Sequence, residues 1–475
     1  MSTTDTLVFK APLTTRAELK ALGLLTAPIL VSQLAQAAYG FIDTLMASQV
    51  SPIDLAAVAV GSGIWLPLFL LITGILLATT PLVAEAYGSQ QRQRIAGITH
   101  QALWLALGVG AIGFFLMRNA YPIFQWLGVP LELRELTQQY LLGVSWGMPA
   151  VGVFFALRCY CEAQGYPTQV MIISVSGLSL NVAFNTLFIH GSESVAWLAW
   201  LPIPIPAMGG PGCGWATSIV LWLMSGIMLA YVLASRHFKH SRLMLAWEPP
   251  KWSEIKAIAT LGLPIGVAIF FEASAFALVA VLVSPQGALG VAGHQVALSI
   301  TSFLFMVPLS VAIALTIRVG QFYGARDFAA ILHVRRVGLI TATCIAAGMS
   351  MILLFSRDAI TAVYTDDIAV RELAAQLMLF AVAYQIFDAL QVAAAGCLRG
   401  LQDTQSPMRL TLFAYWGVAI PVGYVIGSTN FVGGHSWGPH GYWLGLVLGL
   451  LVASILLNWQ LGRTLRVVKA RWHVA

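Results

Sequence analysis

Three acidic residues of this sequence lie inside long apolar stretches, where an ionised side chain is costly. They are Asp43, Glu272 and Asp388. A carboxylate in hydrocarbon costs about 2.5–3.5 kcal/mol even on lenient insertion scales, and such acids mark ion or substrate pathways. No Lys or Arg lies as deep in an apolar stretch, so we predict an interior that binds cations or protons. The other acidic residues fall in predicted tails, loops or last helical turns, where we expect water or lipid headgroups to solvate them.

Glu272 and Asp388 lie near the middle of their apolar stretches, and Tyr384 precedes Asp388 by one helical turn. This spacing places Tyr384 and Asp388 on the same face of a helix. Two carboxylates and a phenol hydroxyl are the oxygen ligands that hard cations prefer. We predict that Glu272, Tyr384 and Asp388 form a cation site, which binds Na⁺ if the protein is sodium-coupled. The same oxygens can bind protons, so the choice between Na⁺ and H⁺ stays open.

The first apolar stretch carries a polar stripe that ends at Asp43. Gln33, Gln36, Gly40 and Asp43 recur at intervals of three and four residues and therefore share one helix face. Pro28 and Gly40 interrupt this helix, and such residues permit bending where neighbouring groups satisfy the freed backbone. We predict a cation-coupling role for Asp43 and a hinge at Pro28 and Gly40.

The fifth apolar stretch contains Asn181 and Asn185, which also share a helix face. Buried amides often only join neighbouring helices by hydrogen bonds, each worth roughly 0.6 kcal/mol. Because these two are paired as regularly as the glutamines of the first stretch, we predict a functional role. Gln33, Gln36, Asn181 and Asn185 are expected to line a substrate cavity.

The composition identifies the class of protein in which these residues act. The chain has 475 residues, of which 59% are hydrophobic and 9% charged, and its mean hydropathy is +0.82. Soluble domains carry about 25% charged residues, so this composition predicts an all-α, polytopic membrane protein. Twelve apolar segments approach the roughly 20 residues that span a bilayer: about 22–47, 54–80, 96–117, 137–157, 168–190, 213–234, 257–283, 290–316, 336–356, 373–397, 408–428 and 441–462.

The basic residues are distributed unevenly between the two sides of these segments. All Lys and Arg except Arg118, Arg134, Arg357 and Arg371 fall in the termini, in the even-numbered loops or at the helix ends that border them. Such a bias predicts that both termini and the even loops are cytoplasmic. We expect the membrane to be a bacterial inner membrane. The net charge of +6 is thus explained by topology, and we expect no nucleic-acid partner.

The two halves of the sequence resemble each other. The segment "LAAVAVGSGIWLPLFLLITGILLATTPLVAEAYGSQQ" aligns without gaps on "VAGHQVALSITSFLFMVPLSVAIALTIRVGQFYGARD". Six spans per half is an even number, which predicts two six-helix bundles related by a pseudo-two-fold axis along the membrane normal, with a central cavity. The expected parts are an N-terminal tail (1–20), an N-lobe (21–235), a cytosolic linker (236–256), a C-lobe (257–463) and a C-terminal tail (464–475).

Other classes of membrane protein fit these features less well than an ion-coupled transporter. The sequence contains no nucleotide-binding loop, zinc spacing or Ser-His-Asp set, so we predict no enzyme and no cofactor, with an ion gradient as the energy source. A flippase for a lipid-linked precursor would need Arg or Lys in its cavity to bind pyrophosphate. A receptor would leave the duplicated bundles unexplained.

The quoted features also resemble a known family. The segments "VSQLAQAAYGFIDTLMAS", "FFEASAF", "LNVAFN" and "YQIFDALQVAAAGCLRGLQDT" are similar to the multidrug and toxic compound extrusion (MATE) family, NorM-type branch. The resemblance implies that Asp43 is a cation-linked residue of the N-lobe and that Glu272, Tyr384 and Asp388 form a C-lobe cation site. It also implies export of cationic, often aromatic drugs and dyes in exchange for Na⁺ or H⁺. We expect a monomer in contact with membrane lipid.

Overall fold

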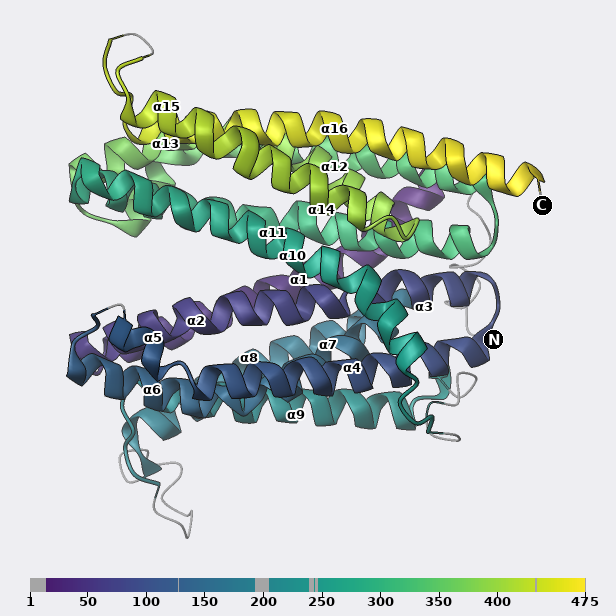
Figure 1. Ribbon diagram of the computed structural model, residues 1–475, viewed down its shortest axis with the longest axis horizontal. Coiled ribbons are helices and arrows are strands. Elements are labelled where there is room, and N and C mark those ends of the chain that lie inside the picture. The colour runs from purple at the N-terminus through teal and green to yellow at the C-terminus, as the bar shows by residue number, and fades with distance from the viewer. Residues whose placement is uncertain are drawn as a thin grey trace. The chain divides into compact units, whose positions relative to one another are not determined.

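The described part of the chain is entirely helical wherever it has regular structure (Figure 1). In this computed structural model it comprises residues 14–126, 128–192, 205–238, 243, 247–431 and 434–474, so most of the predicted N-terminal tail and part of the linker lie outside it. The α-helices are α1 (Thr15–Ser48), α2 (Pro52–Leu76), α3 (Thr79–Gly88), α4 (Arg92–Arg118), α5 (Tyr121–Trp126), α6 (Leu131–Ser145), α7 (Gly147–Ala163), α8 (Pro167–His190), α9 (Gly212–Ala234), α10 (Trp252–Val283), α11 (Ala288–Gly324), α12 (Phe328–Tyr364), α13 (Ile368–Gly400), α14 (Gln405–Leu412), α15 (Ile420–Ser428) and α16 (Pro439–Val474). A π-helical turn, η5 (Phe413–Ala419), joins α14 to α15, and η3 (Arg236–Phe238) and η4 (Ser284–Gln286) are single 3₁₀ turns.

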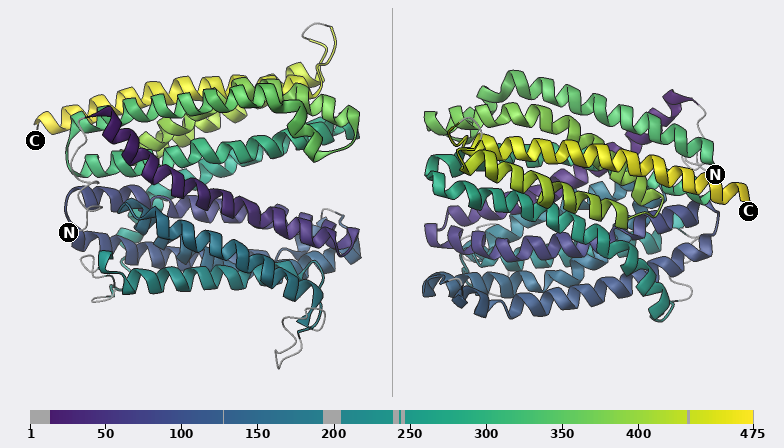
Figure 2. Two further views of the ribbon diagram at one scale, coloured as in Figure 1. Left: turned by 180° about the vertical axis from the view of Figure 1, so that it is seen from behind. Right: turned by 45° about the horizontal axis from the view of Figure 1, so that its top comes forward.

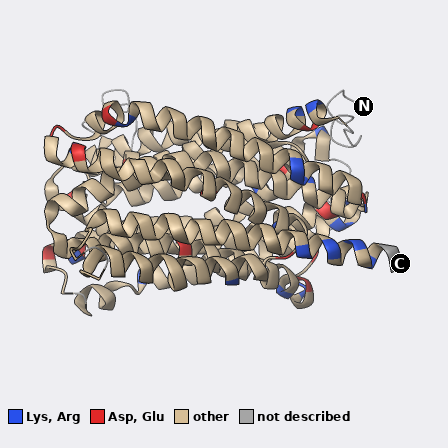
Figure 3. Cartoon of the chain, turned by 90° about the horizontal axis from the view of Figure 1, so that it is seen from above, with Lys and Arg blue, Asp and Glu red and all other residues tan. Residues whose placement is uncertain are grey.

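Twelve helical segments of the described residues are long and apolar enough to cross a membrane, which confirms the predicted all-α fold with twelve spans. Several are longer than predicted. The 37 residues of α11 extend about 55 Å, well beyond the roughly 30 Å of bilayer hydrocarbon. Likewise α1 begins at Thr15, inside the predicted tail, and α16 continues through the basic segment after residue 463, drawn blue beside the C label in Figure 3.

The chain divides into two compact units. We call them the C-terminal unit (the described residues up to Leu30, Gly88–Gln90 and the chain from Val267 onward) and the N-terminal unit (Val31–Tyr87 and Gln91–Gly266). Two helices, α1 and α10, contribute to both units. Each division falls shortly after a proline inside the helix, Pro28 in α1 and Pro264 in α10. These prolines are related by the same offset as the two aligned repeat segments, so the duplication extends to the breaks in these helices.

Two acidic residues that we expected to be solvated are instead buried and paired with arginine. The Glu18 carboxylate accepts two hydrogen bonds from Arg318, at 3.0 and 2.7 Å, and neither side chain is more than 1% exposed. Glu162 accepts a bond of 2.7 Å from Arg158, and this pair is also buried. The expectation was wrong because these helices pack against neighbours up to their last turns. Arginine therefore replaces water as the partner of the charge.

Small residues bring α15 and α16 into close contact in the C-terminal unit. A Cβ atom built on Gly445 would lie 2.5 Å from the Cα of Gly423, so position 445 has no room for a larger residue. This packing is typical of membrane helices that meet through small residues. Two stripes face each other: Ala419, Gly423 and Gly427 on η5 and α15, and Gly441, Gly445 and Gly449 on α16. Figure 2 shows α16, in yellow, running alongside α15.

Candidate cation sites

The first site surrounds Asp43 in the N-terminal unit. Asp43 lies on α1 and is 4% exposed. Asn185 on α8 donates its Nδ2–H to Oδ1 of Asp43 at 2.7 Å, and Thr217 on α9 donates its hydroxyl to Oδ2 at 3.0 Å. Each carboxylate oxygen therefore has one donor, and both donors are uncharged. Hydrogen bonds of this kind stabilise the ionised carboxylate in a buried position.

The donors of Asp43 are themselves joined in a ring. Asn185 Nδ2 also donates to Oδ1 of Asn181 at 3.1 Å, and Asn181 Nδ2 lies 3.3 Å from the Thr217 hydroxyl oxygen. The structure thus brings Asn181 and Asn185 to Asp43, as their shared helix face suggested. Oδ1 of Asn185 has no donor among the described residues. Thr217 was missed from the sequence because a single threonine in an apolar helix has no distinguishing spacing.

Tyr39 packs above this ring, one turn before Asp43 on α1. Its hydroxyl lies 3.2 Å from Sδ of Met224 and 3.4 Å from the carbonyl oxygen of Ser174, to which it donates. A Cβ atom on Gly177 would come within 2.4 Å of the Tyr39 hydroxyl, so glycine is required there. The sequence spacing of Tyr39 and Asp43 equals that of Tyr384 and Asp388, and this repeated pattern could have identified Tyr39.

The remaining predicted residues of α1 stand apart from the Asp43 ring. Gln33 and Gln36 are partly exposed, and no hydrogen bond among the described residues joins either of them to Asp43. Nε2 of Gln36 is buried without an acceptor. Gly40 is exposed, and nothing lies within 4 Å of a Cβ atom built on it. Pro28 lies within α1, which is helical on both sides of it.

The second site lies in the C-terminal unit, where the structure brings together Glu272 on α10 and Tyr384 and Asp388 on α13. Asp388 is 0% exposed, and neither of its carboxylate oxygens has a hydrogen-bond partner in the described structure. Its charge interacts with that of Glu272, and Tyr384 lies close enough to interact with both acids. An isolated buried carboxylate is strongly unfavourable. Arg399, buried near the end of α13, contributes a positive charge that interacts with Glu272, whereas Asp388 has no bonded partner among the described residues and is left to bind a proton or a cation.

Glu272 has a partner that the sequence analysis missed. The hydroxyl of Tyr415, on η5, donates to Oε1 of Glu272 at 2.8 Å and lies 3.3 Å from Oε1 of Gln391. Gln391 follows Asp388 by one turn of α13, so its spacing could have revealed it. Tyr415 comes from a different span, and no sequence spacing connects it with Glu272. Gln385, also on α13, is buried, and both polar atoms of its amide lack a partner within the described residues.

Aromatic rings pack against Tyr384 and Tyr415 of the second site. The ring centroid of Phe276 lies 6.2 Å from that of Tyr384 and 5.9 Å from that of Tyr415. The ring centroid of Trp443 lies 6.5 Å from that of Tyr384. The indole N–H of Trp443 donates to Nδ1 of His294 at 3.2 Å. An apolar wall of this kind lowers the local dielectric constant, so the attraction between the acids and a bound cation is stronger than in water.

Comparison with known sequences identifies related proteins over nearly the whole chain. The profile of the MatE family matches residues 28–187 and 264–425, one stretch in each half. The chain is 45% identical to the probable multidrug resistance protein NorM of Acinetobacter baylyi, covering 94% of this chain and 96% of that protein. It is 42% identical to the multidrug resistance protein PmpM of Pseudomonas aeruginosa, covering 95% and 92%.

Solved structures share the fold. An outward-facing multidrug resistance MATE family transporter of the MOP superfamily matches with a TM-score of 0.87 at 18% identity, covering 99% of each chain. The eukaryotic MATE transporter AtDTX14 matches with a TM-score of 0.83 at 18% identity, covering 96% of this chain and 99% of that one. At such low identity these similarities establish the fold alone.

Proposed function

The chain belongs to the multidrug and toxic compound extrusion family, and from that premise we propose that it is a multidrug efflux antiporter. It exports cationic, often aromatic compounds in exchange for Na⁺ or H⁺. The observation that carries the proposal is Asp388, a buried carboxylate that has no hydrogen-bond donor among the described residues and whose charge interacts with that of a second acid, Glu272. A fixed pair of this kind binds one positive species or another and is unfavourable when it binds none.

The proposed cycle uses alternating access to a substrate cavity, and both lobes, 21–235 and 257–463, take part in it. A drug cation enters from the cytosol or the inner leaflet of the inner membrane, on the side of the two cytoplasmic termini. Ionised acids and aromatic faces attract it. Once the cavity opens outward, Na⁺ or H⁺ binds Glu272, Tyr384 and Asp388 and displaces the drug. Pro28 and Gly40 act as the hinge of α1, and Gln33, Gln36, Asn181 and Asn185 line the drug path.

The membrane voltage assists this exchange only if more positive charge returns than leaves. One monovalent drug exchanged for one ion moves no net charge. Each additional ion adds about 2.3 kcal/mol per 100 mV. Asp43 and the Glu272–Asp388 pair are separate acidic sites, so a second coupling ion has a place to bind.

A flippase for an anionic lipid-linked precursor is the alternative, and no contact in the described structure favours it. Such cargo needs unpaired cationic side chains in its path. The buried Arg158 and Arg318 are instead bound to Glu162 and Glu18. The charge of the buried Arg399 interacts with that of Glu272.

Reconstituted vesicles test the proposal. The purified protein is placed in liposomes loaded with a fluorescent aromatic cation such as ethidium, and a Na⁺ gradient and a pH gradient are applied separately. We expect dye efflux under at least one gradient and none without a gradient. Dye efflux that is indifferent to both gradients would refute the antiport mechanism.

A further inference from the structure

The eleventh span departs from α-helical geometry beside the second cation site. Residues 413–419 form the π-helical turn η5, in which the N–H of Ile420 bonds to the carbonyl of Tyr415, five residues earlier. Pro421 follows, has no N–H, and in an α-helix its ring would clash with the carbonyl of Gly417. The wider turn avoids this clash. Such π turns are rare and occur frequently at functional sites.

The π turn directs two successive side chains at two successive residues of α10. The hydroxyl of Tyr415 bonds to Oε1 of Glu272 at 2.8 Å, and the indole N–H of Trp416 donates to the carbonyl oxygen of Phe271 at 3.1 Å. Tyr415 is buried, whereas Trp416 is 37% exposed. The Trp416 bond holds the backbone of α10 and restricts rotation of this helix. The Tyr415 bond holds the side chain of Glu272 and restricts the position of its carboxylate.

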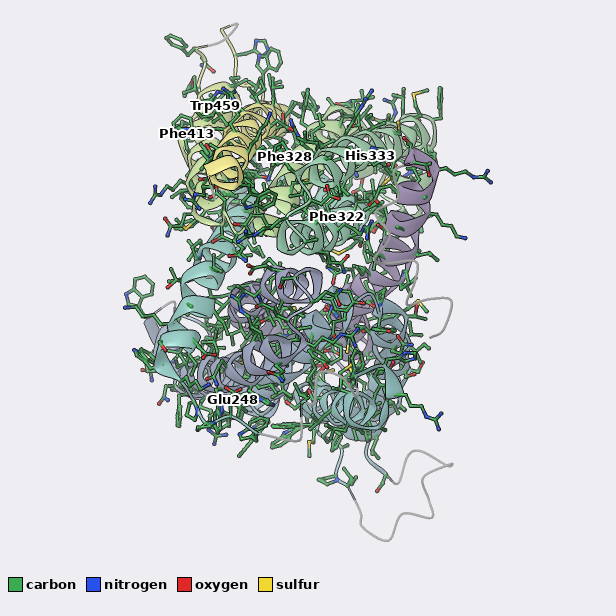
Figure 4. The ribbon with its side chains drawn as sticks, turned by 90° about the vertical axis from the view of Figure 1, so that its right-hand side faces the viewer. Glu248, Phe322, Phe328, His333, Phe413 and Trp459 are labelled. Carbon is green, nitrogen blue, oxygen red and sulfur yellow. The ribbon has the colours of Figure 1, made fainter. Side chains whose placement is uncertain are left out.

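The opposite side of the π turn is held by α16. A Cβ atom on Gly449 would lie 2.5 Å from the Cβ of Ala419, the last residue of η5. Phe413, its first residue, is exposed and lies toward the outer face of the unit, as does Trp459 of α16 (Figure 4). The turn is therefore supported by close helix contact and cannot shift freely away from Glu272.

Tyr415 has one hydroxyl proton and two oxygen atoms within reach. Oε1 of Glu272 lies at 2.8 Å and Oε1 of Gln391 at 3.3 Å, so the shorter bond goes to the carboxylate. A cation that binds Glu272 competes with that proton for the same oxygen. The hydroxyl can then rotate its proton to Gln391 and present its lone pairs to the cation, without any movement of the backbone.

We propose that Tyr415 is a positioning residue of the cation site. Its hydroxyl holds Glu272 toward Asp388 while the site is empty, and it turns to Gln391 when the coupling ion binds. This inference rests on the proposed antiport function and adds a residue from the eleventh span to it.

Replacing Tyr415 by Phe tests the inference, because it removes the hydroxyl and keeps the ring. In the ion-bound site the Tyr415 hydroxyl contacts the cation through its lone pairs, and losing such a contact with a charged group changes an equilibrium about tenfold or more. We therefore expect the half-saturating concentration of the coupling ion to rise about tenfold, while the maximal efflux rate at saturating ion stays within about twofold of wild type. The rise in melting temperature that Na⁺ induces in the detergent-solubilised protein should decrease in parallel.

Tyr442→Phe is the matched control. Tyr442 is as deeply buried as Tyr415 and lies in the same unit. The substitution removes a 2.5 Å hydrogen bond between the Tyr442 and Ser428 hydroxyls. No hydrogen bond among the described residues joins Tyr442 to Glu272 or Asp388. We expect wild-type ion dependence from this variant. The same ion dependence in Tyr415→Phe as in Tyr442→Phe would overturn the inference.

Gln391→Met keeps the test decisive if Tyr415→Phe does not fold. It removes the second acceptor of the Tyr415 hydroxyl and the amide's own interaction with Glu272, so the ion requirement should rise here too, and an unchanged requirement would overturn the inference. If the proposed antiport function is wrong, the wild-type protein itself will show no ion-driven efflux. In that case a smaller Na⁺-induced stabilisation in Tyr415→Phe than in wild type still supports the inference, and an equal one refutes it.

Discussion

Asp43 and Asp388 are both buried aspartates within membrane-spanning helices, but their surroundings differ. In the N-terminal unit, Asn185 and Thr217 each donate a hydrogen bond to one oxygen of Asp43. In the C-terminal unit, neither oxygen of Asp388 has a donor in the described structure, and its charge interacts with that of another acid, Glu272. The protein thus satisfies one buried carboxylate with its own side chains and leaves the other unsatisfied.

Burial alone therefore does not identify an acid that binds an exchangeable ion. Around Asp43, two neutral hydrogen-bond donors replace water. The charge of Glu18 is paired with that of Arg318. Asp388 has neither kind of partner among the described residues, so we expect a proton or cation to supply one. Removing the charge from each of these three acids should therefore change the stability of the protein by a different amount.

The largest effect is expected from neutralising the second site. Glu272→Gln and Asp388→Asn should each abolish ion-driven dye efflux in vesicles, because the remaining acid cannot hold the coupling ion alone. Asp388→Asn should not lower the melting temperature in detergent, since it removes an unsatisfied buried charge. Wild-type efflux in both variants would contradict the assignment of this site. A marked loss of stability in Asp388→Asn would show that Asp388 has a partner in the resting protein.

The next largest effect concerns an acid with a permanent partner. Glu18→Gln leaves Arg318 buried without a counter-ion, and breaking a buried ion pair in this way costs about 3–5 kcal/mol. Unfolding in SDS mixed micelles measures this cost. Glu254→Gln is the control, because Glu254 pairs with Lys251 at 3.6 Å on the surface and both are about half exposed. Exposed pairs contribute about 0–1 kcal/mol. Equal losses in the two variants would show that burial does not determine the cost.

A smaller effect is expected at Asp43. In Asp43→Asn, one acceptor oxygen becomes an amide donor, so either Asn185 or Thr217 loses the acceptor of its proton. An unsatisfied buried donor costs about 1–3 kcal/mol. The same unfolding measurement should place this variant between Glu18→Gln and Asp388→Asn. Dye export from cells should also decrease, and dye accumulation equal to that of wild-type cells would argue against a coupling role for Asp43.

The sequence predicts the twelve helices and the residues that cluster by spacing, but it does not predict contacts between distant spans. Asn181 and Asn185 share a helix face with each other, and so do Tyr384 and Asp388, which is why those groups could be proposed from periodicity. Tyr415 reaches Glu272 only because a π turn redirects it. The pairing of Glu18 with Arg318 depends on how far α1 and α11 extend beyond the hydrocarbon thickness, which an apolar pattern does not determine.

The smallest expected effect tests whether the unsatisfied character of the second site extends beyond Asp388. Gln385 is fully buried, and both polar atoms of its amide lack partners in the described part of the chain. Gln385→Leu removes these atoms at similar volume, so the free energy of unfolding should stay within about 1 kcal/mol of wild type or increase, as replacing unpaired polar groups by apolar ones predicts. SDS unfolding with and without Na⁺ measures the change.

A loss of stability that appears only in Na⁺ would make the Gln385 amide oxygen part of the ion site, because the stabilising partner would then be the ion itself. A loss in both conditions would show that the amide is satisfied by ordered water, and the unsatisfied character of the second site would then be confined to Asp388.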